Sequence, residues 1–233
     1  MMRVRFAAAA AIAGVLLATP ATATTIFFAD FEDGLLPSAF TLDLNSTGSG
    51  TTGRVRVLGD PSLAPGGRFG LAFDDSTVSG SDTTSEANLL LDLSNRTQVL
   101  LSFDVRDVGD ETDPLPASFT GSAGGDGVSF SVDGTTFFRL IGGTLALGNR
   151  PASLSFDLTA AAIANSVVLS DTTTIRFQQS DNFPIPSDGL IYDNILVADV
   201  PLPATASLLL VALGAVALRK RSGSGSTSAS VQS

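Results

Sequence analysis

Short runs in which apolar and polar residues alternate recur along the central part of the chain, and this period of two constrains the fold more than any other feature. The clearest runs are Leu101–Arg106, Val128–Asp133 and Leu154–Leu158. Alternation places successive side chains on opposite faces of a strand, so each run predicts a strand with one buried face. Eight weaker candidates are 26–31, 40–44, 54–58, 69–73, 87–93, 137–141, 174–178 and 190–197.

Turn residues separate these runs, and helix signals are almost absent. Asp133 and Gly134 lie between two runs and predict a hairpin turn with φ > 0. Only 159–165, rich in Ala, is helix-like. About eleven strands within residues 24–199, a length sufficient for one core, predict a single all-β domain, an antiparallel β-sandwich of jelly-roll type.

The N-terminal residues predict export. Arg3 and Arg5 precede an apolar run over 6–18, and Ala21 and Ala23 form a small-x-small cleavage site. This order is typical of a secretory signal helix, so we expect signal peptidase to remove 1–23. The alternative is an uncut anchor, for which thirteen apolar residues are few.

The C-terminal residues carry a second targeting pattern. An apolar stretch over 204–218 lies between a Val-Pro-Leu-Pro-Ala run and a basic cluster. Counted from Leu202 it has seventeen residues, roughly 25 Å of helix and the lower limit for a transmembrane helix. The basic cluster predicts that the body lies outside the cytoplasm. These elements comprise Val200, Pro201, Leu202, Pro203 and Ala204, then Arg219, Lys220 and Arg221.

This C-terminal order resembles the PEP-CTERM/VPLPA-CTERM sorting signal of Gram-negative bacteria. The resemblance implies processing within 200–204 by an exosortase-type transpeptidase, after transient anchoring in the inner membrane, and delivery to the cell surface or extracellular polysaccharide matrix. The sorting signal then spans 200–221. A Ser/Gly-rich tail over 222–233, expected to be disordered, departs from the family pattern. A single-pass anchor that is never cut remains the alternative.

The body resembles concanavalin-like and MAM-like jelly-roll domains. The residues that carry this resemblance are Phe31–Gly34, Asp126–Gly134 with the following Phe137–Arg139, and Ile191–Ile195. The resemblance implies that the last strand returns beside the first.

Charge and composition restrict the function. All 23 acidic residues but only 8 of the 13 basic ones lie in 24–199, which leaves the body at −15. Such a field repels nucleic acid and attracts cations. The chain has no His and no Cys, so His- and Cys-based catalysis, the usual transition-metal ligands and disulfides are excluded.

Three motifs point toward enzymes without completing a site. The glycines of Gly48–Gly53 match a dinucleotide-binding pattern, but a strand follows them, so we interpret them as a hairpin loop. Glu111–Asp113 begins the two-carboxylate motif of concanavalin-like glycosidases, and Pro114 interrupts it. Asp-Thr-Thr tripeptides at Asp82 and Asp171 lack the Gly that follows in aspartic proteases.

The best candidate for a cation is one acidic loop. Calcium takes six to eight oxygen ligands, and the loop offers four carboxylates, Asp107, Asp110, Glu111 and Asp113. The alternative interpretation is that these carboxylates are solvated turn residues. The same interpretation applies to the acidic residues at other strand ends, Asp74, Asp75, Asp126 and Asp188. Calcium is the only cofactor that the sequence suggests.

Two features concern glycans. The chain has no Trp, and glycan-binding faces usually present Trp or Tyr, which disfavours a lectin unless Tyr192 lies on an exposed sheet face. The run Asp43–Thr47, with Asn45 at its centre, matches the extended bacterial N-glycosylation pattern.

We therefore expect a non-enzymatic, structural or adhesive protein of the cell surface or matrix. The alternatives are a carbohydrate-binding module, with or without calcium, and a glycan hydrolase that uses two Asp carboxylates.

Overall fold

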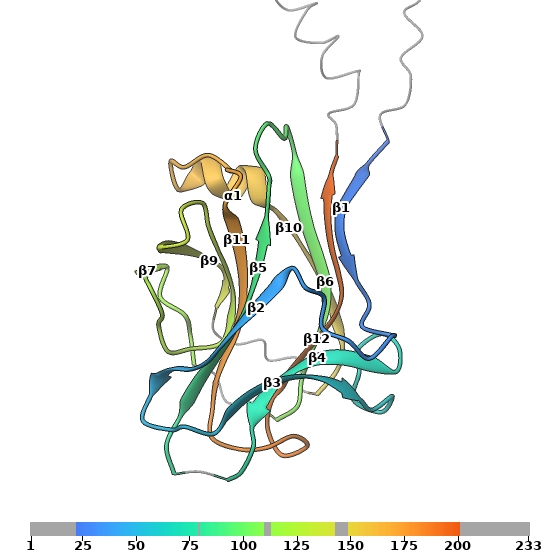
Figure 1. Cartoon of the computed structure of the whole chain (residues 1–233), viewed down its shortest axis with the longest axis vertical. Helices are drawn as coiled ribbons and strands as arrows, with labels where there is room; N and C mark the ends of the chain where they lie inside the picture. The colour runs from blue at the N-terminus through green and yellow to red at the C-terminus, as the bar shows by residue number, and fades with distance from the viewer. Residues whose placement is uncertain (1–21, 79, 110–112, 143–148, 201–233) are drawn as a thin grey trace, which may run out of the picture. The chain divides into compact units, whose positions relative to one another are not determined.

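The structure is a computed structural model that describes residues 22–78, 80–109, 113–142 and 149–200. Its strands form two antiparallel sheets that face each other (Figure 1). Sheet A has the order β10-β6-β12-β4-β3, with β1 also paired to β12, and sheet B has the order β2-β5-β11-β8-β9-β7. The elements are β1 Thr24–Ala29, β2 Phe40–Gly48, β3 Gly53–Gly59, β4 Phe69–Asp75, β5 Thr83–Leu91, β6 Val99–Asp107, β7 Ser118–Thr120, β8 Gly127–Ser131, β9 Thr136–Gly142, β10 Ala152–Asp157, α1 Leu158–Ala164, β11 Thr173–Asp181 and β12 Leu190–Asp199.

The predicted antiparallel sandwich is confirmed, and its topology is jelly-roll-like. Most neighbouring strands are not consecutive in sequence, and the last strand, β12, pairs with β1 as the resemblance implied. Every alternating run corresponds to a strand, whereas β7 was not predicted. The Ala-rich stretch forms α1, which begins at its N-cap Asp157, whose side chain accepts a hydrogen bond from the Ala160 N–H.

The core between the sheets consists mainly of Phe and aliphatic side chains. Phe103, Phe177 and Tyr192 form its centre, with ring centroids 5.0 Å apart for Phe177 and Tyr192 and 5.6 Å for the other two pairs. Tyr192 is fully buried in this cluster, so it does not lie on an exposed sheet face.

Two local expectations have different outcomes. The turn at Asp133 and Gly134 joins β8 to β9 as a hairpin, with Gly134 at φ 72°. The interpretation of Gly48–Gly53 as a hairpin loop is wrong, because the segment joins β2 in sheet B to β3 in sheet A. β2 pairs with β5 and β3 pairs with β4, so the two strands do not pair with each other. The segment between them therefore crosses from one sheet to the other.

The targeting segments lie largely outside the described residues. Within residues 22–78, 80–109, 113–142 and 149–200, no helix has the length and apolar character needed to cross a bilayer. The predicted signal helix, the apolar stretch 204–218 and the tail 222–233 fall outside that part of the chain. So do Ala21, Pro201, Leu202, Pro203, Ala204, Arg219, Lys220 and Arg221.

Candidate functional site

The outer face of sheet B is partly covered by the chain itself. Residues 113–126, which we call the covering segment, run over β11 and include the short strand β7, which pairs with β9. The side chains of β11 that point away from the core, Thr174, Arg176, Gln178 and Ser180, are therefore buried. This explains why every residue of β11 is buried on both faces of the strand.

Arg176 fixes the middle of the covering segment to the sheet. Its guanidinium pairs with Glu86 at 3.2 Å and donates hydrogen bonds to Asn88 Oδ1 and the Gly121 carbonyl, both at 2.8 Å. Its Cζ lies 3.6 Å from the centroid of the Phe137 ring, a cation–π contact. Burial raises the pKa of Glu86 and lowers that of Arg176, which is the desolvation cost of a buried pair.

Gln178 holds the C-terminal part of the covering segment. Its Nε2 donates to the carbonyls of Ala123, at 2.8 Å, and Gly125, at 2.9 Å. Two backbone carbonyls of the segment are thus bound by one side chain, which positions Gly124 between them.

Asp126 closes the covering segment. Its Oδ2 accepts from the Asp113 N–H at 2.9 Å, and its Oδ1 accepts from the Ser180 N–H at 2.8 Å. One carboxylate therefore joins both ends of the segment to β11. Burial raises the pKa of Asp126 to about 7, and the charges of Asp113 and Asp181 add to the shift.

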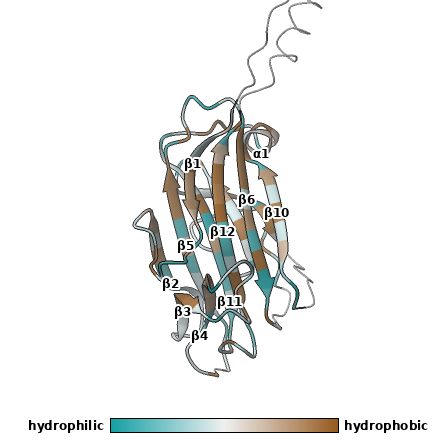
Figure 2. Ribbon diagram, turned by 90° about the vertical axis from the view of Figure 1, so that its right-hand side faces the viewer, coloured by the Kyte–Doolittle hydropathy of each residue, from teal (hydrophilic) through white to brown (hydrophobic). Residues whose placement is uncertain are grey.

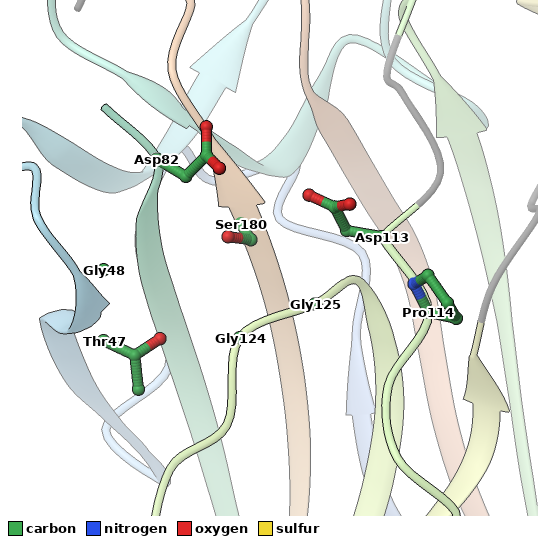
Figure 3. A pocket seen from close by; sticks show the side chains of 8 residues that line it. All are labelled: Thr47, Gly48, Asp82, Asp113, Pro114, Gly124, Gly125 and Ser180. Carbon is green, nitrogen blue, oxygen red and sulfur yellow. The ribbon is translucent and has the colours of Figure 1, made fainter. Parts of the chain in front are cut away.

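A pocket of about 400 Å³ lies between this segment and the ends of β2 and β5. Figure 3 shows the Asp82 and Asp113 carboxylates on either side of Ser180, with the backbone of Gly124 and Gly125 below. The lining residues are Thr47, Gly48, Asp82, Asp113, Pro114, Gly124, Gly125 and Ser180.

A row of hydroxyl groups crosses three neighbouring strands at the pocket. The Oγ1 of Thr47 on β2 donates to the Oγ1 of Thr84 on β5 at 2.5 Å, and Thr84 donates in turn to the Ser180 Oγ on β11 at 3.3 Å. The three residues are directly opposite one another in the sheet register. Thr84 is buried, and the hydroxyls at the two ends of the row line the pocket.

Glycines allow the walls to come together. Gly48 has φ 90°, and a Cβ there would lie 2.1 Å from the Asp82 carbonyl oxygen. Gly125 has φ 126°, and its Cβ would lie 2.8 Å from the Asp113 carbonyl oxygen. Both positions therefore require glycine. At Gly124 a Cβ would make ordinary contacts at 3.7–3.8 Å with the hydroxyls of Thr47 and Thr84, so its missing side chain leaves the pocket open.

The predicted calcium loop is only partly described. Asp107 is buried as the last residue of β6, and Asp113 lines the pocket. Asp110 and Glu111 lie outside the described residues. In the described ranges no group of three or more acidic side chains is arranged to hold a metal ion. The calcium site at Asp107, Asp110, Glu111 and Asp113 stays a prediction.

The interpretation of the strand-end aspartates as solvated turn residues is wrong. Asp74, Asp75, Asp126 and Asp188 are all buried. Asp74 accepts hydrogen bonds from Arg54, at 2.8 and 2.5 Å, and from Arg56, at 3.0 Å. Burial favours a higher pKa for Asp74, but these arginines outweigh it and lower the pKa.

Two of the segments that resemble jelly-roll domains, Phe31–Gly34 and Ile191–Ile195, meet at one loop. The Glu32 Oε1 accepts from the backbone N–H groups of Arg68 and Phe69, at 2.7 and 3.1 Å, and the Asp193 Oδ2 accepts from the Gly66 N–H at 3.1 Å. Burial, reinforced by the charges of Glu32 and Asp104, raises the pKa of Asp193 to about 6. These carboxylates join the start and the end of the domain through the loop before β4.

Sequence reasoning did not find the pocket, although it noticed some of its residues. Asp82 belongs to one of the Asp-Thr-Thr tripeptides, and its second Thr, Thr84, is the middle of the hydroxyl row. The other tripeptide, at Asp171, lies in the turn before β11, whereas the pocket residue Ser180 lies near the far end of that strand. Two more pocket residues were also noticed for other reasons, Asp113 in the predicted calcium loop and Gly48 in the Gly48–Gly53 pattern.

No protein-family model and no curated protein matches this sequence. Solved structures with a similar fold include a family 61 carbohydrate-binding module in complex with β-1,4-galactotriose, at 14% identity and TM-score 0.43, covering 72% of this chain and 92% of that chain. A family 11 carbohydrate-binding module of a cellulosomal cellulase of Clostridium thermocellum matches at 13% identity and TM-score 0.43, covering 79% and 98%. The K3 cleaved adhesin domain of Lys-gingipain from Porphyromonas gingivalis matches at 12% identity and TM-score 0.46, covering 75% and 98%. These are remote likenesses of fold.

Proposed function

We propose that this protein is an exported, non-catalytic β-sandwich that binds a hydroxyl-rich ligand of the carbohydrate class in the pocket of sheet B. The observation that carries the proposal is the pairing of two carboxylates, Asp82 and Asp113, with the hydroxyl row that ends at Thr47 and Ser180. A volume of about 400 Å³ is within the usual range for small-molecule sites.

The chemistry of the lining suits sugar hydroxyls. Ionised carboxylates accept hydrogen bonds only, and two vicinal hydroxyls of a sugar can donate to one carboxylate. Thr and Ser hydroxyls donate as well as accept, so they complement the ring and glycosidic oxygens. None of the eight lining residues is basic, which favours neutral or amino sugars over sulfated or uronic ones.

The affinity should be modest. None of the lining residues is aromatic, so ring stacking contributes nothing at this pocket. Hydrogen bonds that replace water contribute about 1 kcal/mol each. We expect dissociation constants in the range of about 0.01–1 mM for the preferred oligosaccharide.

Calorimetric titration with a panel of neutral, amino and sulfated oligosaccharides tests the proposal. We expect neutral or amino oligosaccharides to bind and Asp113→Ala or Asp82→Ala to weaken binding by about tenfold, the equivalent of 1.4 kcal/mol. Asp171→Ala removes the same charge from an exposed turn outside the pocket and is the control. Equal binding by all three variants would overturn the proposal. Recovery of intact ligand distinguishes binding from hydrolysis by the same two carboxylates.

A second proposed role concerns destination and rests on the Val200–Ala204 run with its apolar stretch and basic cluster. In this role the protein is a structural or adhesive component sorted to the cell surface or polysaccharide matrix. The mass of the mature C-terminus tests it. We expect an end within 200–204, and an intact Ser233 end in the membrane fraction would exclude processing.

A further inference from the structure

We propose that Asn45 is an acceptor for N-linked glycosylation by a bacterial-type oligosaccharyltransferase, with Asp43 and Thr47 as its recognition residues. An acidic residue two positions before the Asn and a hydroxyl residue two positions after it occur here together. The structure adds where this run lies in the fold and how it is held.

The run lies on an exposed edge. β2 is the terminal strand of sheet B and pairs only with β5 among the strands of the sheet. The register between them shifts between Asp43 and Thr47, so the central residues of the run lie in a bulge. An edge strand with an interrupted ladder is the part of a sheet that another protein can most easily engage.

The acceptor side chain is on the surface. Asp43 and Asn45 are both exposed, and Asn45 has φ 63°, which turns the backbone sharply at the acceptor. The Asn45 Oδ1 accepts a hydrogen bond from the Gly53 N–H at 2.9 Å. The carboxamide is therefore held by its oxygen, and its nitrogen is the atom that would carry the glycan.

The step requires a lipid-linked oligosaccharide diphosphate as co-substrate. The bond between the anomeric carbon and the diphosphate oxygen breaks, and a bond forms between that carbon and Asn45 Nδ2. The amide nitrogen loses one proton to solvent, and the lipid diphosphate leaves with the electron pair of the broken bond. No oxidant or reductant is involved.

A second site in the chain serves as an internal control. Asn95 is followed by Arg96 and Thr97, which completes the simpler Asn-x-Thr pattern. Asn95 is exposed and has φ 59°, so it matches Asn45 in accessibility and backbone conformation. Two positions earlier it has the buried Leu93 instead of an acid. The two sites differ in the acidic recognition residue and in how the carboxamide is held, because the Asn95 Nδ2 donates to the Ser94 Oγ at 3.5 Å.

The experiment uses the purified, folded, full-length chain in detergent with an oligosaccharyltransferase and its lipid-linked donor, so it does not depend on export. Peptide mass spectrometry should find one glycan on the peptide containing Asn45 and none on Asn95. Asn45→Asp keeps an oxygen for the Gly53 N–H and should abolish the modification. Asp43→Ala should reduce occupancy at least tenfold, and Thr47→Ser should retain it.

A synthetic peptide of residues 41–49 in the same reaction separates recognition of the sequence from its accessibility in the folded chain. If the peptide is modified and the folded chain is not, the fold occludes the site and the proposal is wrong. If neither is modified, the run is not a substrate and the proposal is also wrong. Modification of Asn95 in preference to Asn45 would contradict the role of Asp43.

Discussion

The two halves of the space between the sheets are equally buried but chemically opposite. Toward the α1 end, the inward residues of β11 are Ile175 and Phe177, and toward the pocket end they are Gln179 and Asp181. β5 shows the same change, from Leu89 and Leu91 to Thr83 and Ser85. Figure 2 shows a similar change along β5 and β6, with brown ribbon in the upper part and teal at the lower end.

The apolar half mainly stabilises the fold, whereas the polar half mainly positions the groups around the pocket. Apolar burial provides the main driving force for folding, about 25 cal/mol per Å², and it is concentrated in the Phe-rich half. The polar half contains buried groups whose hydrogen bonds fix the geometry, and the Oγ atoms of Thr83 and Ser85 are buried without a hydrogen-bond partner. The pocket is built on the half that contributes less to stability.

Phe177→Ala should have the largest effect. The Phe177 ring packs against Tyr192 at 5.0 Å and Phe103 at 5.6 Å between centroids, and its removal leaves a cavity that costs about 3–5 kcal/mol. Denaturant unfolding measures this change. Leu90→Ala, at a residue that is 54% exposed, should stay within about 0.5 kcal/mol. Comparable losses in the two variants would contradict the assignment of the core.

Arg176→Met should cause the next largest loss of stability, because Arg176 fixes the covering segment to the sheet. It leaves Glu86 buried and unpaired, which costs about 3 kcal/mol in the free energy of unfolding. The double variant Arg176→Met with Glu86→Leu removes both charges and should be less destabilised than Arg176→Met alone. A double variant with the summed losses of the two single variants would mean that the two charges do not interact.

The pH dependence should differ between the two buried carboxyls. In the folded protein the pKa is about 7 for Asp126 and about 6 for Asp193, whereas an Asp side chain in the unfolded chain titrates near 3.8. Both carboxyls therefore keep their protons to a higher pH in the folded state. Their stabilisation is complete below about pH 4 and is lost as the pH rises through 6 and 7. Asp74, with a lowered pKa, acts in the opposite direction at lower pH.

Unfolding measured between about pH 5 and 8 tests this dependence. Asp126→Asn should reduce the fall in unfolding free energy between pH 6 and 8, while Asp193→Asn should reduce it mainly below pH 6. An unchanged slope in Asp126→Asn would show that Asp126 is ionised throughout, and its raised pKa would then be wrong.

The layered fold was predictable from the sequence because it depends on local periodicity. Leu101–Arg106 alternates strictly, and the structure buries one of its faces as β6 requires. β11 was found from Thr174–Gln178, but the burial of its outer face was not. That burial comes from the covering segment, whose contact with Arg176 joins residues 55 positions apart.

The pocket was not predictable for the same reason. Its residues come from the end of β2, the start of β5, the covering segment and the end of β11. In the sequence, each of these segments has the composition of an ordinary turn, and Asp126 is indistinguishable from a solvated aspartate. Only the pairing of β5 with both β2 and β11 aligns Thr47, Thr84 and Ser180.

The most direct test of the central claim fills the pocket with one side chain. Gly124→Val projects a side chain toward Thr47 and Thr84 from a position where a Cβ makes only ordinary contacts, whereas Gly80→Val adds the same atoms where nothing lies within 4 Å. Titration with the preferred oligosaccharide should show binding about tenfold weaker for Gly124→Val and unchanged for Gly80→Val. Unchanged affinity in a folded Gly124→Val would show that the ligand binds elsewhere or that the sandwich binds none.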